Sequence, residues 1–142
     1  ETTPIESERD EPWGLTVAEE RVDRTDPFFY HKTTHRRVYD RALQSAREQG
    51  FDEALLLNEE GQVTEGAHSS LFVQTDDALL TPPVDCGLLP GVYREYVLET
   101  EERAEERTLT LDDLRSAEAL YCCNAVQGWC RAVLREAPVP AP

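Results

Sequence analysis

The spacing of apolar residues predicts two helices, with a series of short apolar runs between them. Apolar side chains at 38, 42, 43 and 46 recur on one helical face, which indicates an amphipathic helix of roughly 15 residues. Thr33 or Thr34 can cap its first turn, and Gly50 follows as a stop. A second helix is predicted over 92–99, directly after a loop that contains glycine and proline. Lys32 therefore lies just ahead of the N-terminus of the first helix.

The short apolar runs predict strands that pair as hairpins. Turn residues such as Asn58 and Gly61 separate the runs. Strands interleaved with a few helices indicate a mixed α/β (α+β) domain whose strands dominate the core. The predicted hairpins are 53–58 with 62–66, 70–74 with 78–81, and 119–124 with 129–134. The less regular segments predict short strands at 14–17 and 108–111, helical turns at 18–22 and 112–114, and a solvated charge run at 101–106.

The charge balance narrows the range of partners. The chain carries 29 acidic residues against 14 basic ones, a formal net charge of −15. This excess argues against a nucleic acid or an anionic membrane as partner. No apolar run approaches the roughly 20 residues that span a bilayer, and no signal-peptide pattern opens the chain. We therefore expect a cytoplasmic protein that binds a small-molecule substrate.

The four cysteines, at 86, 122, 123 and 130, indicate buried free thiols rather than disulfides. Cys122 and Cys123 would point to opposite faces of a strand, so their spacing does not suit a zinc site. His31 and His68 are predicted to make local hydrogen bonds, because no cluster of Cys, His and Asp has the spacing of metal ligands. No metal is expected.

Lys32 stands out because it is the only lysine among the 14 basic residues. Arginine can replace lysine as a surface cation, but its guanidinium does not lose a proton near neutral pH to become a nucleophilic amine. A lone lysine is therefore a candidate for a Schiff base with a carbonyl compound, for which pyridoxal 5′-phosphate is the common cofactor. The alternative is that Lys32 is a chance survivor of an arginine-biased composition.

Three further features suit pyridoxal phosphate. A carboxylate such as Glu65 would keep the pyridine nitrogen protonated, the form in which the ring acts best as an electron sink. The helix start at Gly91-Val92-Tyr93 offers backbone N–H groups to a phosphate, although an ordinary turn is the simpler explanation. A second turn, Asn124-Ala125, can close around the same anion.

The blocks that contain these residues resemble the class IV aminotransferases, the fold type IV pyridoxal phosphate enzymes, from about Asp26 to Leu134. The resemblance implies the C-terminal, larger domain of the D-amino-acid aminotransferase-like fold, with a strand-rich, barrel-like core and flanking helices. It also implies a polar linker at 1–25, a cofactor-binding domain at 26–136 and a tail at 137–142. The matching blocks are Lys32-Thr33-Thr34-His35-Arg36, Val63-Thr64-Glu65-Gly66 through Leu71-Phe72, Leu88-Leu89-Pro90-Gly91-Val92-Tyr93-Arg94, and Asn124-Ala125-Val126-Gln127-Gly128-Trp129.

The resemblance assigns a role to individual residues. Lys32 would be the Schiff-base lysine and the acid/base that moves the Cα proton, and Glu65 would hold the pyridine nitrogen. Arg36 and Arg94 are weaker candidates for binding substrate carboxylates, with salt bridges as the alternative. The cofactor phosphate would be bound by the backbone amides of Val92 and Tyr93, with Asn124 and Ala125 on its other side.

Three positions depart from the family pattern. His35 and Ser70 stand where asparagine is usual, and Ala125 stands where a serine or threonine often gives a hydroxyl to the phosphate. The family's smaller N-terminal domain, which supplies an arginine to the phosphate and much of the substrate pocket, is expected to be missing from this chain.

Within the family, residues 26–34 look most like 4-amino-4-deoxychorismate lyase, in particular the lyase region fused behind a 4-aminobenzoate synthase component I. This likeness implies formation of 4-aminobenzoate and pyruvate in folate biosynthesis, by a homodimer. Two alternatives stay open. One is a branched-chain or D-amino-acid transaminase of the same fold, and the other is a catalytically silent fragment that acts as an interaction or dimerisation module.

Overall fold

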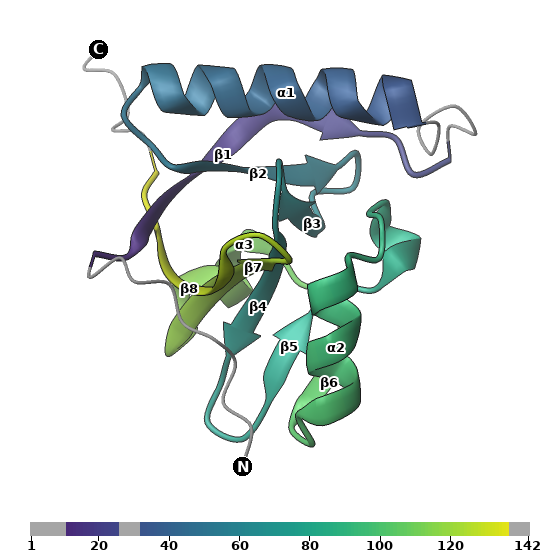
Figure 1. The fold of residues 1–142 in the computed structure, drawn as a ribbon, viewed down its shortest axis with the longest axis vertical. Helices are drawn as coiled ribbons and strands as arrows, with labels where there is room; N and C mark the ends of the chain where they lie inside the picture. Colours follow the sequence, from purple (N-terminus) through teal and green to yellow (C-terminus); the bar gives the residue numbers. More distant parts are fainter. Residues whose placement is uncertain (1–10, 26–31, 137–142) are drawn as a thin grey trace.

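The computed structural model describes residues 11–25 and 32–136, with side chains from Arg36 onward in the second range. In these residues the strands form one curled sheet, and helices pack against it (Figure 1). The helices are α1 (Lys32–Glu48), α2 (Val92–Thr100) and α3 (Leu111–Arg115), with a 3₁₀ turn η1 (Val84–Cys86). The strands are β1 (Trp13–Val22), β2 (Glu53–Asn58), β3 (Val63–Gly66), β4 (Ser70–Gln74), β5 (Leu79–Thr81), β6 (Ala104–Glu106), β7 (Ala119–Asn124) and β8 (Gly128–Leu134).

The strands follow the order β3-β2-β1-β8-β7-β4-β5-β6, so β1 lies inside the sheet. β1 runs parallel to β2 on one edge and to β8 on the other, and Leu15 lies opposite both Glu53 and Leu134. Because the sheet curls, β3 contacts β4 although the sheet order separates them. This half-barrel with flanking helices confirms the predicted mixed α/β fold with a strand-rich core.

β1 differs from what the local pattern predicts. The pattern predicts a strand at 14–17 and a helical turn at 18–22, but Trp13–Val22 form a single strand. The expected linker at 1–25 does not hold for these residues, because β1 is hydrogen-bonded between β2 and β8. Residues 18–20 lie in an irregularity of the register between Val17 and Arg21, and the paired segments on either side of it keep them extended despite their helical preference.

The three predicted hairpins are confirmed as the antiparallel pairs β2–β3, β4–β5 and β7–β8. The predicted strand at 108–111 is wrong. The strand in this region is β6, which forms from the charge run and pairs in parallel with β5, so that Leu80 lies opposite Glu105. An outer strand tolerates charged side chains because one of its edges faces solvent. Leu109 is nevertheless buried, and its carbonyl accepts a hydrogen bond from the N–H of Val63 at 2.8 Å.

The helix α1 confirms the first predicted helix, but it begins at Lys32, so Lys32 lies in its first turn and Thr33 and Thr34 lie inside the helix rather than at its cap. It lies across β1 and β2 (Figure 1). Its buried face carries Tyr39, Ala42 and Ala46, which pack in one cluster with Leu56 of β2. Gly50 follows the helix with a φ of 91°, a left-handed conformation that suits glycine and ends the helix. The small alanines allow α1 to lie close to the sheet, which also brings Tyr39 against it.

The two faces of β7 belong to different parts of the core. Cys122 packs in the main cluster with Leu15, whereas Cys123 packs with Phe72 and with Val97 of α2. This confirms that the neighbouring cysteines point to opposite faces of a strand. All four cysteines are buried and free, as predicted.

None of the helices in the described part of the chain is long and apolar enough to cross a membrane. Among the same residues, no group of three or more His, Cys, Asp or Glu side chains is arranged to hold a metal ion.

Phe72 provides a test of the core assignment. Its side chain is fully buried, and its ring centroid lies 5.4 Å from that of Trp129. We expect Phe72→Ala to lower the free energy of unfolding by about 3–5 kcal/mol, because it leaves a cavity in a packed cluster. Urea denaturation followed by tryptophan fluorescence measures this loss.

The control for Phe72→Ala is Val126→Ala, in a turn where the side chain is 93% exposed. It should change the free energy of unfolding by less than about 0.5 kcal/mol. A similar loss in both variants would contradict the packing described for Phe72.

Candidate active site

Glu65 lies on β3, where antiparallel pairing places it opposite Leu56 of β2. Only 8% of Glu65 is exposed. The hydroxyl of Tyr39, on α1, donates to Glu65 Oε2 at 2.9 Å. The backbone N–H of Leu89 donates to the same oxygen at 3.2 Å. A helix, a strand and a loop therefore meet at this carboxyl group.

Burial raises the pKa of Glu65 to about 8, because the loss of water disfavours the charged carboxylate. The charge of Glu53 raises the pKa further, whereas the hydrogen bonds from Tyr39 and Leu89 and the charge of Arg94 lower it. A carboxyl group in this environment gains stability from a cation placed beside it. A protonated pyridine nitrogen is such a cation, so Glu65 has the chemistry to hold the ring nitrogen of pyridoxal phosphate.

The start of α2 has the form of an anion-binding helix terminus. Its cap residue, Gly91, has no side chain that could cap the helix. The backbone N–H of Glu95 donates the first helical hydrogen bond to the carbonyl of Gly91, at 3.1 Å. The backbone N–H groups of Val92 and Tyr93 thus precede the hydrogen-bonded part of the helix. A Cβ atom at Gly91 would lie 3.1 Å from Ser70 Oγ, which is tighter than usual packing. Glycine therefore lets β4 approach a helix end that favours a phosphate.

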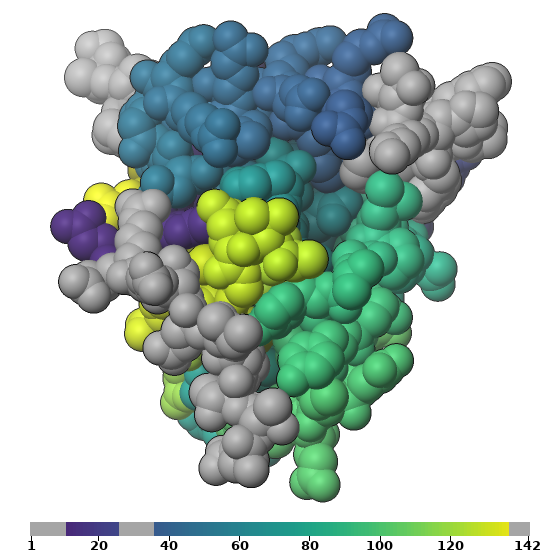
Figure 2. All heavy atoms as spheres, in the orientation of Figure 1, coloured from purple at the N-terminus to yellow at the C-terminus, as the bar shows by residue number. Residues whose placement is uncertain are grey.

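Asn124 ends β7 and shapes the turn into β8. Its Oδ1 accepts hydrogen bonds from the backbone N–H of Val126 at 3.0 Å and of Gln127 at 2.7 Å. Its Nδ2 donates to the carbonyl of His68 at 2.9 Å. Ala125, next in the turn, is exposed. In Figure 2 the turn is coloured yellow-green and lies at the surface, below the blue α1.

The short turn between β3 and β4 connects these parts. Glu65 and Gly66 precede the turn, and Ser70 follows it beside Gly91. The carbonyl of His68, within the turn, holds Asn124. The structure therefore brings Glu65, the start of α2 and the turn after β7 together, although they are far apart in the sequence.

Lys32 is the first residue of α1, and its side chain lies outside the described part of the structure, as does that of His35. His31 lies outside it entirely. Tyr39 follows Lys32 by about two helical turns and contacts Glu65. α1 is thus a rigid link between the backbone of the candidate lysine and the buried carboxyl group.

Arg94 takes part in the packing of α2. Its guanidinium is 1% exposed, donates to the carbonyl of Pro82 at 3.1 Å and forms ion pairs with Glu95 and Glu106. This arrangement matches the salt-bridge alternative rather than contact with a substrate. Arg36 is exposed on α1, and its role toward substrate stays a prediction.

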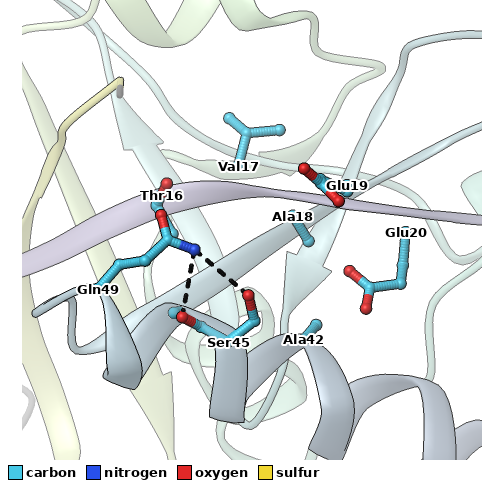
Figure 3. Close-up of a pocket in the computed structure, with 9 residues that line it drawn as sticks. Thr16, Val17, Ala18, Glu19, Glu20, Ala42, Ser45 and Gln49 are labelled. Atoms are coloured by element: carbon cyan, nitrogen blue, oxygen red, sulfur yellow. Dashed lines mark hydrogen bonds between the residues drawn. The ribbon is translucent and has the colours of Figure 1, made fainter. Parts of the chain in front are cut away.

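A separate cavity of about 120 Å³ lies between β1 and α1 (Figure 3). Gln49 donates to the carbonyl and the hydroxyl of Ser45 at its edge, at 3.2 and 3.3 Å. Glu19 and Glu20 of β1 also line it. None of the residues predicted to bind cofactor or substrate lines this cavity, so it is distinct from the candidate active site.

Two groups that contact Glu65 were not predicted from the sequence. Tyr39 shares a helical face with Ala42 and Ala46, so the periodicity indicates its burial, but not that its hydroxyl reaches β3. Leu89 contributes only its backbone N–H, which its residue type does not reveal.

A family model described as amino-transferase class IV matches residues 1–133. The chain belongs to this family. Its members use pyridoxal phosphate and include transferases and lyases. The buried carboxyl group of Glu65 and the start of α2 described above have the chemistry that fits that cofactor.

The similar proteins include both kinds of enzyme. The branched-chain-amino-acid aminotransferase of Escherichia coli (strain K12) is 33% identical over 82 residues, which make up 57% of this chain and 26% of that enzyme. A solved structure from Mesorhizobium loti, provisionally assigned as an amino-acid aminotransferase, has a TM-score of 0.80 and 41% identity, covering 89% of this chain and 61% of that one. A structure from Legionella pneumophila, provisionally assigned as a 4-amino-4-deoxychorismate lyase, has a TM-score of 0.80 and 27% identity, covering 92% and 50%. In each comparison the chain spans less than two thirds of its relative.

The raised pKa of Glu65 should make the stability of the cofactor-free protein depend on pH. The folded-state pKa of about 8 exceeds the ordinary value of 4.5, so the unfolded state releases this proton first as the pH rises. The contribution of Glu65 is therefore fully present below about pH 4.5 and is lost as the pH rises to about 8, by up to roughly 1.4 kcal/mol per pH unit. Urea denaturation at a series of pH values measures the slope.

Glu65→Gln isolates this effect because glutamine does not titrate. Between about pH 4.5 and 8 the free energy of unfolding should fall less steeply in Glu65→Gln than in the unchanged protein. Parallel pH profiles would show that the pKa of Glu65 is not raised.

Proposed function

We propose that this chain is the cofactor-binding part of a pyridoxal phosphate-dependent 4-amino-4-deoxychorismate lyase, which forms 4-aminobenzoate and pyruvate. The observation that carries the proposal is the buried Glu65 carboxyl group, linked by one short turn to two candidate phosphate-binding segments in a class IV chain. The lyase assignment is supported by the resemblance of residues 26–34 and by the likeness to the Legionella structure.

Each part of the cofactor has a candidate partner in the chain. Glu65 would hold the ring nitrogen, and Lys32 would bind the aldehyde carbon. The backbone N–H groups of Val92 and Tyr93 would bind the phosphate, with the turn at Asn124-Ala125 on its other side. Ala125 offers no hydroxyl, which would cost on the order of 1 kcal/mol if a single hydrogen bond is left unmade.

The chain's own residues would act mainly by positioning a base. When bound, pyridoxal phosphate supplies an electron sink for the charge that forms at the substrate Cα. Once the substrate's amine has taken its place at the aldehyde carbon, Lys32 would take the Cα proton with its neutral amine, a form that its position at the N-terminus of α1 favours modestly. The hydrogen bond from Tyr39 to Glu65 would keep α1, and with it the backbone of Lys32, fixed relative to the ring.

A branched-chain-amino-acid transaminase is the second candidate, because the Escherichia coli (strain K12) enzyme is 33% identical to the matched part of this chain. It would use the same lysine and the same ring-nitrogen partner, and would differ in returning an amino group to a keto acid. For either activity we expect the complete enzyme to contain the family's smaller N-terminal domain and to form a homodimer. The further expectation that the enzyme is fused to a 4-aminobenzoate synthase component I is based on the resemblance of residues 26–34 to such fusions.

The role of Lys32 is tested by mixing the purified chain with pyridoxal phosphate and reducing it with borohydride. Mass spectrometry of the digested chain should find the cofactor attached at Lys32, because reduction makes the bond to the amine permanent. Lys32→Arg is the matched variant, since it keeps the positive charge but has no nucleophilic amine, and it should retain no cofactor. Equal retention by the two proteins would favour the catalytically silent alternative.

The products distinguish the two enzymes. In the complete protein, incubation with 4-amino-4-deoxychorismate should release pyruvate and 4-aminobenzoate in equal amounts. A shift of the cofactor to its amine form on addition of a branched-chain amino acid, without pyruvate release from the chorismate derivative, would favour the transaminase.

A further inference from the structure

Glu53 is a fully buried carboxylate that has no place in the expected cofactor site. It begins β2 and is 0% exposed. Its Oε1 accepts hydrogen bonds from the backbone N–H of Ala54 at 2.9 Å and of Ala67 at 3.0 Å. Its Oε2 accepts from the N–H of His68 at 3.1 Å and from the hydroxyl of Ser69 at 2.6 Å. A buried charge is tolerated only where such donors surround it.

The donors of Glu53 come almost entirely from the turn between β3 and β4. Ala67, His68 and Ser69 are consecutive, and His68 Nδ1 also lies 2.7 Å from Glu53 Oε2. One carboxylate therefore fixes three successive residues of this turn. Hydrogen bonds to a charged acceptor are stronger than neutral ones, so the turn has little freedom to move while Glu53 is in place.

Gly66 shows how closely the turn is fitted to Glu53. A Cβ atom on Gly66 would lie 2.6 Å from Glu53 Oε2 and 2.6 Å from Ser69 Oγ, so both of these hydrogen-bonded side chains would have to shift to make room for it. Glycine is thus required here for close approach of the backbone to the carboxylate. Gly66 directly follows Glu65, so the approach also determines where the backbone of Glu65 lies.

The same turn reaches both sides of the candidate cofactor site. The carbonyl of His68 accepts the hydrogen bond from Asn124 Nδ2, which holds the turn after β7. On the other side, Ser70 follows the turn and lies against Gly91 at the start of α2. A movement of residues 67–69 would therefore shift the partners of the ring nitrogen and of the phosphate relative to each other.

We infer that Glu53 is a positioning residue for the cofactor site, which holds the turn between β3 and β4 so that Glu65 and Asn124 are correctly spaced. This inference rests on the proposed function. Glu53 positions these two side chains through the turn, in addition to the direct effect by which its charge raises the pKa of Glu65. The competing explanation is that Glu53 stabilises the fold in general, without a specific effect on cofactor binding.

The test compares binding of pyridoxal phosphate with binding of pyridoxal, which lacks the phosphate. Glu53→Gln keeps the size of the side chain but replaces one of the two accepting oxygens with an NH₂ group. This group would face backbone N–H donors that it cannot accept from, so the turn should shift. We expect its dissociation constant for pyridoxal phosphate to rise by about tenfold or more, and the preference for pyridoxal phosphate over pyridoxal to fall. Both constants are measured by absorbance titration of folded protein, without reference to turnover.

Two further variants make the result specific. Ser69→Ala removes a single hydrogen bond to Glu53 and should reduce the same preference to a smaller extent. Thr81→Val is the matched control, because it removes a buried hydrogen bond of 2.7 Å between β5 and the carbonyl of Leu71 on β4, which involves neither Glu53 nor residues 67–69. It should lower stability while leaving the preference for pyridoxal phosphate unchanged. Ser69→Ala decides the question if Glu53→Gln does not fold.

The outcomes separate this inference from the proposed function. An unchanged protein that binds neither ligand overturns the proposed function and this inference with it. The inference alone is overturned if the unchanged protein binds the cofactor and both Ser69→Ala and Glu53→Gln keep its preference for pyridoxal phosphate over pyridoxal. An equal loss of preference in Thr81→Val would assign the effect to general stability and would also overturn it.

Discussion

The pairing of β1 with a strand on each of its edges is the interaction on which the rest of the structure depends. β1 joins the β2–β3 hairpin, which carries Glu65, to the part of the sheet that carries Asn124. Because β1 and β2 are parallel, the chain must cross over between them, and α1 makes this crossover. The crossover places α1 on the sheet, where Tyr39 reaches Glu65. The position of Lys32 at the start of α1 follows from the same connection.

Glu53 and Glu65 are buried on neighbouring strands, but their carboxyl groups have different surroundings. Glu53 is surrounded by backbone N–H groups and a hydroxyl, so its negative charge is distributed over several donors. Glu65 has the hydroxyl of Tyr39 and the N–H of Leu89 on one oxygen, and its desolvation still dominates, as its raised pKa indicates. This difference matters chemically, because a carboxyl group whose pKa is raised by burial gains stability from a cation placed beside it. The Glu53 carboxylate and the surroundings of Glu65 are thus linked through the turn between β3 and β4.

The sequence predicts this fold well where local signals agree with tertiary pairing, and poorly where they conflict. The β2–β3 hairpin, for example, was predictable because Asn58 and Gly61 mark a turn between apolar runs. The strand β1 was not, because Glu19 and Glu20 favour a helix, and they are extended only because the residues before and after them pair with a strand that is distant in the sequence. In the site, Glu65 was predicted from its family block, whereas its donors were not, since a backbone N–H such as that of Leu89 leaves no trace in residue identity. The positions of Arg36 and Arg94 in the sequence do not reveal that Arg94 is buried in ion pairs whereas Arg36 is exposed.

The contacts of the described residues would serve to place a cofactor more than to recognise a substrate. The contacts around Glu65, α1 and the turn between β3 and β4 would all fix a cofactor ring relative to a lysine on the same helix. Arg94, by contrast, is taken up by Glu106 and by the carbonyl of Pro82, and is therefore not available to recognise a substrate carboxylate. Loss of the Cα proton is common to the lyase and the transaminase, and in the lyase the formation of an aromatic ring supplies much of the later driving force. For a reaction that begins in this way, we expect a fixed position of the proton-accepting lysine to matter more than contacts to the leaving group. The buried hydrogen bonds between α1, β2 and β3, which include those from Tyr39 to Glu65 and from Thr64 to Leu56, would supply such rigidity in the proposed site.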